Sequence, residues 1–248
     1  MAAAVKLHRH IGRRRAERFL AEGPNLVEAA LRRGLVSEVF ATETAMSRFG
    51  AMLTDTPVHL VTERAAKALS DTVTPVGLVA VCSVPETTLA DVLADAPRLV
   101  AVAVEISEPG NAGTLIRVAD AMGADAVVFA GHSVDPYNGK CLRASAGSIF
   151  SIPVVSAPDA SDAVDALTET GLQVLATTVD GELSLDAANL SQPTAWLFGP
   201  EAHGLRPDLA AKATHRVHIP MPGNAESLNV ASAAAICLYQ SARAHPGN

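Results

Sequence analysis

The sequence predicts an α/β protein whose C-terminal part is a doubly wound, mostly parallel sheet. Apolar runs alternate with helix-like patterns through this part, which is the order expected when helices connect parallel strands. The run Leu99–Ile106 is continuously apolar, as in a strand buried on both faces. Apolar residues make up 49% of the chain and aromatic residues 4%, so Ala and Val are expected to fill the core.

The C-terminal elements follow from this alternation. The chain turns at Pro and Gly residues after most of the apolar runs. The segment Tyr137–Gly147 can be helix or loop on its pattern. The expected strands are Leu99–Ile106, Ala126–Ala130, Ile152–Val155, Gln173–Val179, Thr194–Gly199 and Arg216–Pro220, and the expected helices are Asn111–Met122, Asp159–Thr170 and Val230–Ala244.

A smaller α/β domain is predicted over residues 1–85, joined by a linker at residues 86–97 to a second domain over 98–248. Its first element reads as a basic amphipathic helix, Ile11–Glu22. Asn25 and Thr62 stand where helix caps belong. The other expected elements are helices Leu26–Arg33 and Glu63–Leu69 and strands Val36–Thr42, Val58–Val61 and Val76–Val84.

The net charge of −7 argues against a protein that coats nucleic acid along its whole surface. Residues 1–33 nevertheless hold eight Lys and Arg residues against three acids. This segment is either one local contact with a polyanion or a solvated helix face with a loose tail. The three widely spaced cysteines suit core positions better than a zinc site or disulfides. No run suggests a signal peptide or membrane span, so we expect a soluble, cytoplasmic protein.

Three strand-to-helix corners hold most of the suggestive polar residues: Glu105–Arg117, Phe198–Leu205 and Ile219–Ala231. Such corners bring backbone N–H groups and helix N-termini to the mouth of a parallel sheet. Arg117 is expected about one turn inside its helix, where it either binds a phosphate or hydroxyl or is a surface Arg. His203 is either a general base or a solvated loop residue. Ser227 and Asn229 are natural helix caps.

Some familiar fingerprints are missing from the sequence. It lacks the glycine-rich dinucleotide motif, the Walker-type phosphate loop and the nucleophile elbow. An ordinary dinucleotide-dependent oxidoreductase is therefore weakly supported. The segment Lys140–Ser148 places Arg143 and Ser145 where they either meet a phosphate backbone or form a solvated helix end.

Taken together, the corners resemble the three signature motifs of the SpoU (TrmH-like) branch of the SPOUT RNA methyltransferases. The matching residues are Asn111-x-Gly113-x-x-x-Arg117, Gly199-x-Glu201-x-x-Gly204-Leu205, and Ile219-Pro-Met-x-Gly223 with Ser227-Leu-Asn-Val230. The resemblance covers about residues 98–245. More weakly, the first half resembles the small substrate-binding domain that often precedes this catalytic domain. Two positions depart from the family pattern, Pro200 where Asn is common and Ala231 where Ser is common.

The resemblance implies methyl transfer from S-adenosylmethionine to a ribose 2′-hydroxyl of structured RNA. Ribosomal RNA is favoured over transfer RNA as the substrate. It also implies a deep C-terminal trefoil knot, a homodimer in which Arg117 approaches the partner's cofactor, and no metal. The implied catalytic residues are Asn111, Arg117, Glu201, Ser227 and Asn229. The implied cofactor contacts are Thr177, Gly199, Ile219, Met221 and Leu228. The expected contacts with substrate RNA are Arg13, Arg14, Arg15, Arg143 and Ser145.

Two other functions remain open from the sequence. One is a non-catalytic RNA-binding relative that acts in ribosome assembly. The other is a methyltransferase of the same fold that modifies a base rather than a ribose. The intact set of polar residues at the three corners favours the ribose methyltransferase.

Overall fold

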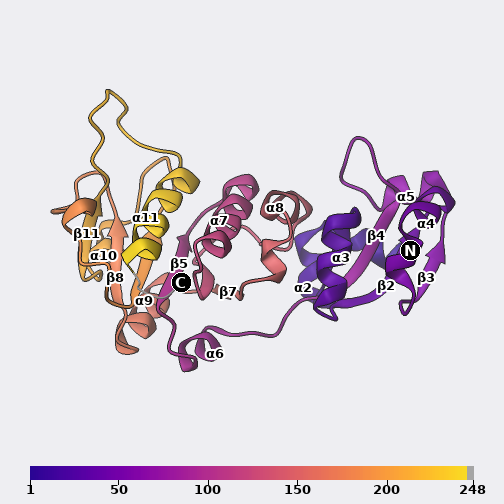
Figure 1. Cartoon of the computed structure of the whole chain (residues 1–248), viewed down its shortest axis with the longest axis horizontal. Coiled ribbons are helices and arrows are strands. Elements are labelled where there is room, and N and C mark those ends of the chain that lie inside the picture. Colours follow the sequence, from indigo (N-terminus) through magenta and orange to yellow (C-terminus); the bar gives the residue numbers. More distant parts are fainter. Residues whose placement is uncertain (245–248) are drawn as a thin grey trace. The chain divides into compact units, whose positions relative to one another are not determined.

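The computed structural model describes residues 1–244, which form two compact units (Figure 1). The N-terminal unit is Met1–Glu86 together with Tyr137–Phe150. The C-terminal unit is Thr87–Pro136 together with the chain from Ser151 onward. The domain predicted over residues 1–85 therefore lacks one segment that packs with it. No helix in the described part of the chain is long and apolar enough to span a bilayer.

The N-terminal unit is built on a four-stranded sheet in the order β1-β4-β2-β3. Strands β1 and β2 both pair antiparallel with β4, and β3 pairs parallel with β2. Strand β4 (Leu78–Ser83) thus lies inside the sheet, between β1 and β2. The elements are α1 (Ala2–Val5), η1 (Lys6–His8), α2 (His10–Ala16), β1 (Arg18–Glu22), α3 (Pro24–Arg32), β2 (Val36–Ala41), α4 (Glu43–Phe49), η2 (Gly50–Leu53), β3 (Val58–Leu60), α5 (Glu63–Ala68), β4 (Leu78–Ser83), α8 (Gly139–Ser145) and η3 (Ser148–Phe150).

The predicted helix Ile11–Glu22 is wrong in its second half. Helix α2 ends at Ala16 because Glu17 adopts a left-handed backbone conformation, with φ of +51°. The chain then continues as β1, whose central residues are buried against β4. A short apolar run of this kind fits a helix or a strand equally well, and the pairing with β4 decides between them. Helix α3 also differs from expectation, since it begins with Pro24 at its first turn and not after Asn25.

The segment Tyr137–Phe150 joins the N-terminal unit through aromatic packing. The ring of Phe19 on β1 lies 4.9 Å from the ring of Tyr137 and 6.0 Å from that of Phe150, measured between centroids. Phe19 is fully buried, and so is Leu142 on α8. Burial of aromatic side chains of this size is a major contribution to a small core. Helix α8 is therefore part of the core of this unit.

The C-terminal unit contains a seven-stranded sheet in which every adjacent pair of strands is parallel. The order is β7-β6-β5-β10-β8-β11-β9, as predicted for a doubly wound fold. The elements are α6 (Leu89–Ala94), β5 (Leu99–Val104), α7 (Pro109–Ala121), β6 (Ala126–Ala130), β7 (Val154–Ala157), α9 (Ala160–Glu169), β8 (Gln173–Thr177), β9 (Leu183–Ser184), η4 (Leu185–Ala187), β10 (Thr194–Phe198), α10 (Pro207–Ala210), β11 (His215–His218) and α11 (Val230–Ala244).

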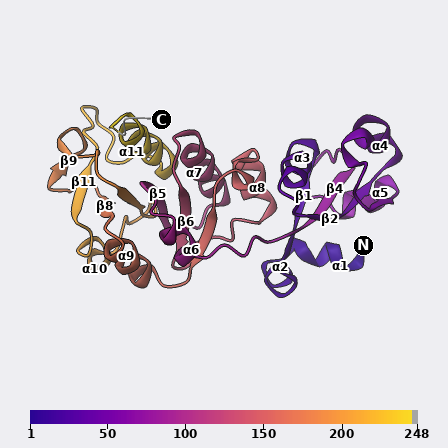
Figure 2. The same ribbon diagram turned by 60° about the horizontal axis from the view of Figure 1, so that its bottom comes forward.

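Helices cover both faces of this sheet (Figure 2). Helices α7 and α11 pack together over one face, while α6, α9 and α10 contribute to the apolar cluster on the other. Buried Trp196 of β10 donates a hydrogen bond from Nε1 to Oγ of Ser241 at 2.9 Å, which joins β10 to α11. The cysteines at 82, 141 and 237 are buried, as predicted.

The strand order explains where the polar corners lie. Strand β10 lies between β5 and β8, and β11 lies on the other side of β8. Because these strands are parallel, the residues that follow each of them emerge at the same edge of the sheet. The corners after β5, β10 and β11 are thus brought together. In the chain, Asn111 of the first corner is 90 residues from Glu201 of the second and 118 residues from Asn229 of the third.

Candidate functional site

A cavity of about 420 Å³ lies at the carboxyl ends of β8, β10 and β11. Its volume falls in the range typical of small-molecule sites. The five residues expected to contact a cofactor all line it: Thr177, Gly199, Ile219, Met221 and Leu228. The structure thus brings these residues together, while their contact with a cofactor stays a prediction.

Glu201 connects the three corners at the edge of this cavity. Its Oε1 accepts hydrogen bonds from Asn111 Nδ2 at 2.8 Å, from Asn229 Nδ2 at 2.6 Å and from the backbone N–H of Val230 at 3.1 Å. Asn229 Nδ2 also donates to Asn111 Oδ1 at 3.0 Å. The carboxylate lies at the N-terminus of α11, where the helix dipole favours a negative charge. Three of the predicted catalytic residues therefore form one hydrogen-bonded group.

Helix α11 begins where its sequence predicts, and one of the two candidate caps performs that role. Asn229 Oδ1 accepts from the backbone N–H groups of Ala231 and Ser232, at 3.0 and 3.3 Å. Ser227 lies two residues earlier and lines the cavity. The cap leaves the Asn229 amide N–H free to bind Glu201, so the capping role and the role in the hydrogen-bonded group coexist in one side chain.

Arg117 is exposed and does not line the cavity of its own chain. Helix α7 begins at Pro109, two residues earlier than predicted, because Pro is favoured in the first turn and Glu108 caps it. Arg117 is consequently about two turns into the helix, and it points about 120° around the axis from Asn111. The expectation that it lies one turn inside the helix is wrong. Within one chain, the guanidinium is not part of the group centred on Glu201.

The Gly199–Leu205 corner is too tight for any side chain at its first position. A Cβ on Gly199 would lie 2.6 Å from the backbone nitrogen of Leu205 and 2.8 Å from the carbonyl carbon of Gly204. Pro200, a departure from the family pattern, contributes its carbonyl oxygen, which accepts from the Gly204 N–H at 2.8 Å. The loss of its N–H is thus compatible with a closed turn. His203 is exposed and lines the cavity.

The cavity walls suit S-adenosylmethionine chemically. Their charged residues are Asp180, Glu201 and Glu226, and no Lys or Arg is among the described residues that line the cavity. Carboxylates at the wall favour a ligand that carries sulfonium and ammonium charges. The hydroxyl oxygen of Thr178, another wall residue, is buried without a hydrogen-bond partner in the described part of the chain. A buried polar atom without a partner is costly, so it fits a site that a polar ligand completes.

Sequence reasoning missed part of this wall. Thr178, Val179 and Asp180 follow β8 directly and line the cavity beside Thr177. The predicted strand ran on to Val179, so Thr178 and Val179 were not expected in a loop. Their position directly after a strand could have identified them, because the carboxyl end of a parallel strand faces the ligand cleft in this class of fold. Glu226 was missed because nothing in its local pattern distinguishes it.

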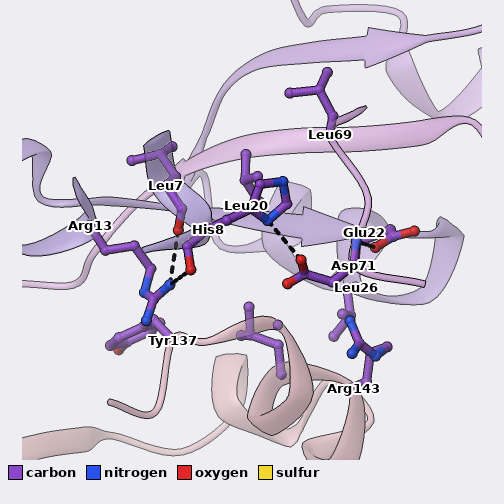
Figure 3. Close-up of a pocket in the computed structure, with 12 residues that line it drawn as sticks. Leu7, His8, Arg13, Leu20, Glu22, Leu26, Leu69, Asp71, Tyr137 and Arg143 are labelled. Atoms are coloured by element: carbon purple, nitrogen blue, oxygen red, sulfur yellow. Dashed lines mark hydrogen bonds and ion pairs between the residues drawn. The ribbon is translucent and has the colours of Figure 1, made fainter. Parts of the chain in front are cut away.

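The five predicted RNA contacts lie in the N-terminal unit, and they divide into two kinds. Arg13 and Ser145 are buried. The guanidinium of Arg13 donates from Nη1 to the carbonyl oxygens of Leu7 and His8, at 2.9 and 3.0 Å (Figure 3). Ser145 Oγ donates to the carbonyl of Leu142 at 2.8 Å. Both side chains stabilise the unit itself, so the expectation that they contact RNA is not supported by their burial.

Arg14, Arg15 and Arg143 remain suited to binding RNA, because all three are exposed. Arg143 borders a small cavity that Leu20, Asp71 and Tyr137 also line (Figure 3). The basic N-terminal segment is also not a loose tail. Ala4 and Leu7 pack into an apolar cluster with residues of the sheet. The segment is therefore an ordered part of the fold.

A parallel α/β sheet with a polar cavity at its carboxyl edge, closed by three glycine-containing corners, defines a class of enzymes that bind a small charged cofactor there. Comparison with known families specifies the class. Residues 98–239 match the SpoU rRNA Methylase family, and residues 2–80 match the MRM3-like substrate binding domain. The chain belongs to the SpoU rRNA methylase family.

Some of its relatives align along nearly the whole chain. The 23S rRNA (guanosine(2553)-2'-O)-methyltransferase RlmP of Bacillus subtilis is 38% identical over 236 residues, which cover 94% of this chain and 92% of the relative. The structure of the SpoU methyltransferase AviRb from Streptomyces viridochromogenes in complex with AdoMet is 30% identical, with a TM-score of 0.87 and coverage of 97% and 95%. The AdoMet-bound rRNA methyltransferase from Sinorhizobium meliloti is 28% identical, with a TM-score of 0.86 and coverage of 98% and 93%.

Proposed function

We propose that this protein transfers a methyl group from S-adenosylmethionine to a ribose 2′-hydroxyl of ribosomal RNA. The observation that carries the proposal is the cavity at the carboxyl edge of the sheet, whose wall unites all five predicted cofactor residues beside the group centred on Glu201. Membership of the SpoU rRNA methylase family supports the reaction. The 38% identical relative named as a 23S rRNA methyltransferase supports ribosomal over transfer RNA.

When bound, the cofactor supplies a methyl group made electrophilic by its sulfonium. The protein must then orient the ribose and stabilise the charge that develops on its oxygen. Glu201, Asn111 and Asn229 hold the three corners in one arrangement. Ser227, on the cavity wall, is placed to orient the substrate or the cofactor. Arg117, a permanent cation, is suited to stabilising an alkoxide or an adjacent phosphate.

The position of Arg117 supports a homodimer. The side chain is exposed and does not line the cavity of its own chain, which leaves it available to another molecule's site. We propose that each subunit supplies Arg117 to the cavity of its partner. The exposed side chains of Ile236 and Tyr239 on α11, the helix that packs against α7, support a protein contact on this side of the unit.

The N-terminal unit is proposed to bind RNA through Arg14, Arg15 and Arg143, all of which are exposed. Its match to a substrate binding domain supports this role. Family membership supports two further features, the deep trefoil knot in the C-terminal unit and action in the cytoplasm on ribosomal RNA. We propose residues 1–85 with Tyr137–Phe150 as the first domain and residues 98–248 without that segment as the second, and the predicted linker 86–97 packs with the second from Thr87 onward.

Radiolabelled methyl transfer tests the reaction. Purified protein is incubated with labelled S-adenosylmethionine and either ribosomal or transfer RNA, and the RNA is digested to nucleosides. We expect label on ribose, in ribosomal RNA, and at least a hundredfold less with Arg117→Ala, in keeping with the usual contribution of one electrostatic group to catalysis. Arg98→Gln is the matched control, because this exposed Arg precedes β5 at the opposite edge of the sheet.

Each alternative predicts a different result in the same experiment. Label on a base would establish a base methyltransferase and refute ribose methylation. A non-catalytic relative would transfer no label, and calorimetry would show no binding of S-adenosylmethionine. Equal incorporation by wild type and Arg117→Ala would refute the role given to Arg117. A mixture of two impaired subunits, Arg117→Ala and Gly199→Ala, should be more active at limiting cofactor than either variant alone if the site is shared between subunits.

A further inference from the structure

One wall of the cavity is formed by the turn that follows β8. This wall segment, Thr178–Glu182, joins β8 to β9. Its first three residues line the cavity, and Val179 is 69% exposed. A turn with so little of its own side chains buried is held in place mainly by polar contacts to its neighbours. The neighbouring strand is β11.

Arg216 of β11 makes the largest set of these contacts. Its backbone N–H donates to Glu182 Oε1 at 2.9 Å, and its Nε donates to Glu182 Oε2 at 2.9 Å. Its Nη1 lies 3.3 Å from Asp180 Oδ2. One Arg therefore binds both carboxylates that flank Gly181. The planar guanidinium, with donors at fixed angles, sets the geometry of two acceptors at once in a way that an ammonium group does not.

The backbone of the wall segment also touches β11 directly. The ring nitrogen Nδ1 of His218 lies 2.8 Å from the carbonyl oxygen of Gly181. A Cβ on Gly181 would lie 2.7 Å from the carbonyl oxygen of Arg216 and 2.7 Å from the nitrogen of His218. These are backbone atoms of a paired strand, which have little freedom to move away. Gly181 is thus the point at which the wall segment is pressed against β11.

We infer that Arg216 is a positioning residue for the cofactor site, because it holds the wall segment and the carboxylate of Asp180 at the cavity. Arg216 itself does not line the cavity. The inference rests on the proposed function, since it assumes that this cavity binds S-adenosylmethionine. Hydrogen bonds from Arg216 lower the pKa of Glu182, so this carboxylate is ionised at neutral pH and the ion pair is intact.

Loosening the wall segment should weaken cofactor binding more than the chemical step. The group centred on Glu201, and Arg117, are not contacted by Arg216. Once the cavity is filled at saturating cofactor, the wall segment is held by the ligand itself, so turnover is preserved. The KM for RNA should not change, because the exposed arginines proposed to bind RNA belong to the other unit.

Full-length Arg216→Gln, Arg216→Lys and the control Arg98→Gln test the inference by calorimetry with S-adenosylmethionine and by steady-state kinetics. We expect Arg216→Gln to raise the Kd and KM for the cofactor about tenfold, with kcat within twofold of wild type. Arg216→Lys should recover part of the affinity, because one ammonium can pair with one of the two carboxylates. Arg98→Gln should bind as wild type does, because its side chain lies at the other edge of the sheet.

A second variant reaches the same segment without changing charge. Gly181→Ala should displace the turn from β11 and raise the cofactor Kd at least as much as Arg216→Gln. If either variant unfolds at the assay temperature, the other is used. A Kd within twofold of wild type for both, or a loss confined to kcat, would overturn the inference. If the wild-type protein binds no S-adenosylmethionine, the proposed function itself fails, and that result is distinct.

Discussion

Ser241→Ala should destabilise the C-terminal unit because it leaves a buried indole N–H without an acceptor. Trp196 and Ser241 are both fully buried, and Nε1 and Oγ are 2.9 Å apart. An unsatisfied buried donor costs about 1–3 kcal/mol of unfolding free energy. At roughly 2–4 °C per kcal/mol for a chain of this size, Tm should fall by roughly 2–12 °C.

The measurement uses the only tryptophan of the chain, Trp196, whose fluorescence reports unfolding of the unit that contains it. Ser232→Ala is the matched control, because Ser232 is an exposed residue of the same helix and the change in helix propensity is the same. A second test places Ser241→Ala in a Trp196→Phe background, followed by circular dichroism, where the donor is already absent. Equal stability of Ser241→Ala and Ser232→Ala in the wild-type background, or an undiminished loss from Ser241→Ala in the Trp196→Phe background, would refute the argument.

Three further predictions concern the site and one helix end. Gly199→Ala should lower the affinity for S-adenosylmethionine by tenfold or more in calorimetry, because its Cβ would collide with backbone at 2.6 Å; unchanged affinity would contradict the tight corner. Glu201→Ala should reduce methyl transfer and lower the unfolding free energy by about 1–2 kcal/mol, because three donors lose their acceptor. Glu201→Gln keeps an acceptor oxygen, so it should lose less activity and less stability. The pKa of Asp91 lies below its usual 3.8, chiefly because the Thr88 hydroxyl donates a hydrogen bond to the carboxylate. The carboxylate therefore stabilises α6 fully above pH 3.8, and this stabilisation disappears as the pH falls through the lowered pKa. Titration by NMR should show the Asp91 pKa rising towards 3.8 in Thr88→Ala, and an unmoved pKa would exclude this cause.

Much of the C-terminal unit could be predicted because its local signals agree with its tertiary structure. The continuous apolar run at Leu99–Ile106 corresponds to β5, which is buried along its whole length. Polar residues at strand ends marked the corners because parallel strands align their carboxyl ends. The α/β class with a parallel sheet and the resemblance to SpoU enzymes are confirmed.

The errors lie where contacts distant in sequence decide the outcome. The second half of the predicted helix Ile11–Glu22 is a strand because β4 pairs with it. Arg13 was expected to meet RNA, yet it is buried against the carbonyls of Leu7 and His8. Composition shows that a segment is basic, but it cannot show which of three successive arginines faces inwards. The contacts of Arg216 were missed for the same reason, since its partners are 34 and 36 residues away in the chain.

The placement of Tyr137–Phe150 in the N-terminal unit also bears on the order of events during synthesis. Tyr137 and Phe150, whose rings pack near Phe19, are translated more than a hundred residues after it. The unit therefore cannot complete its core until β5, α7 and β6 of the other unit have been translated. A nascent chain stalled near residue 100 should expose Phe19 to solvent or to a chaperone, and one stalled after residue 180 should not.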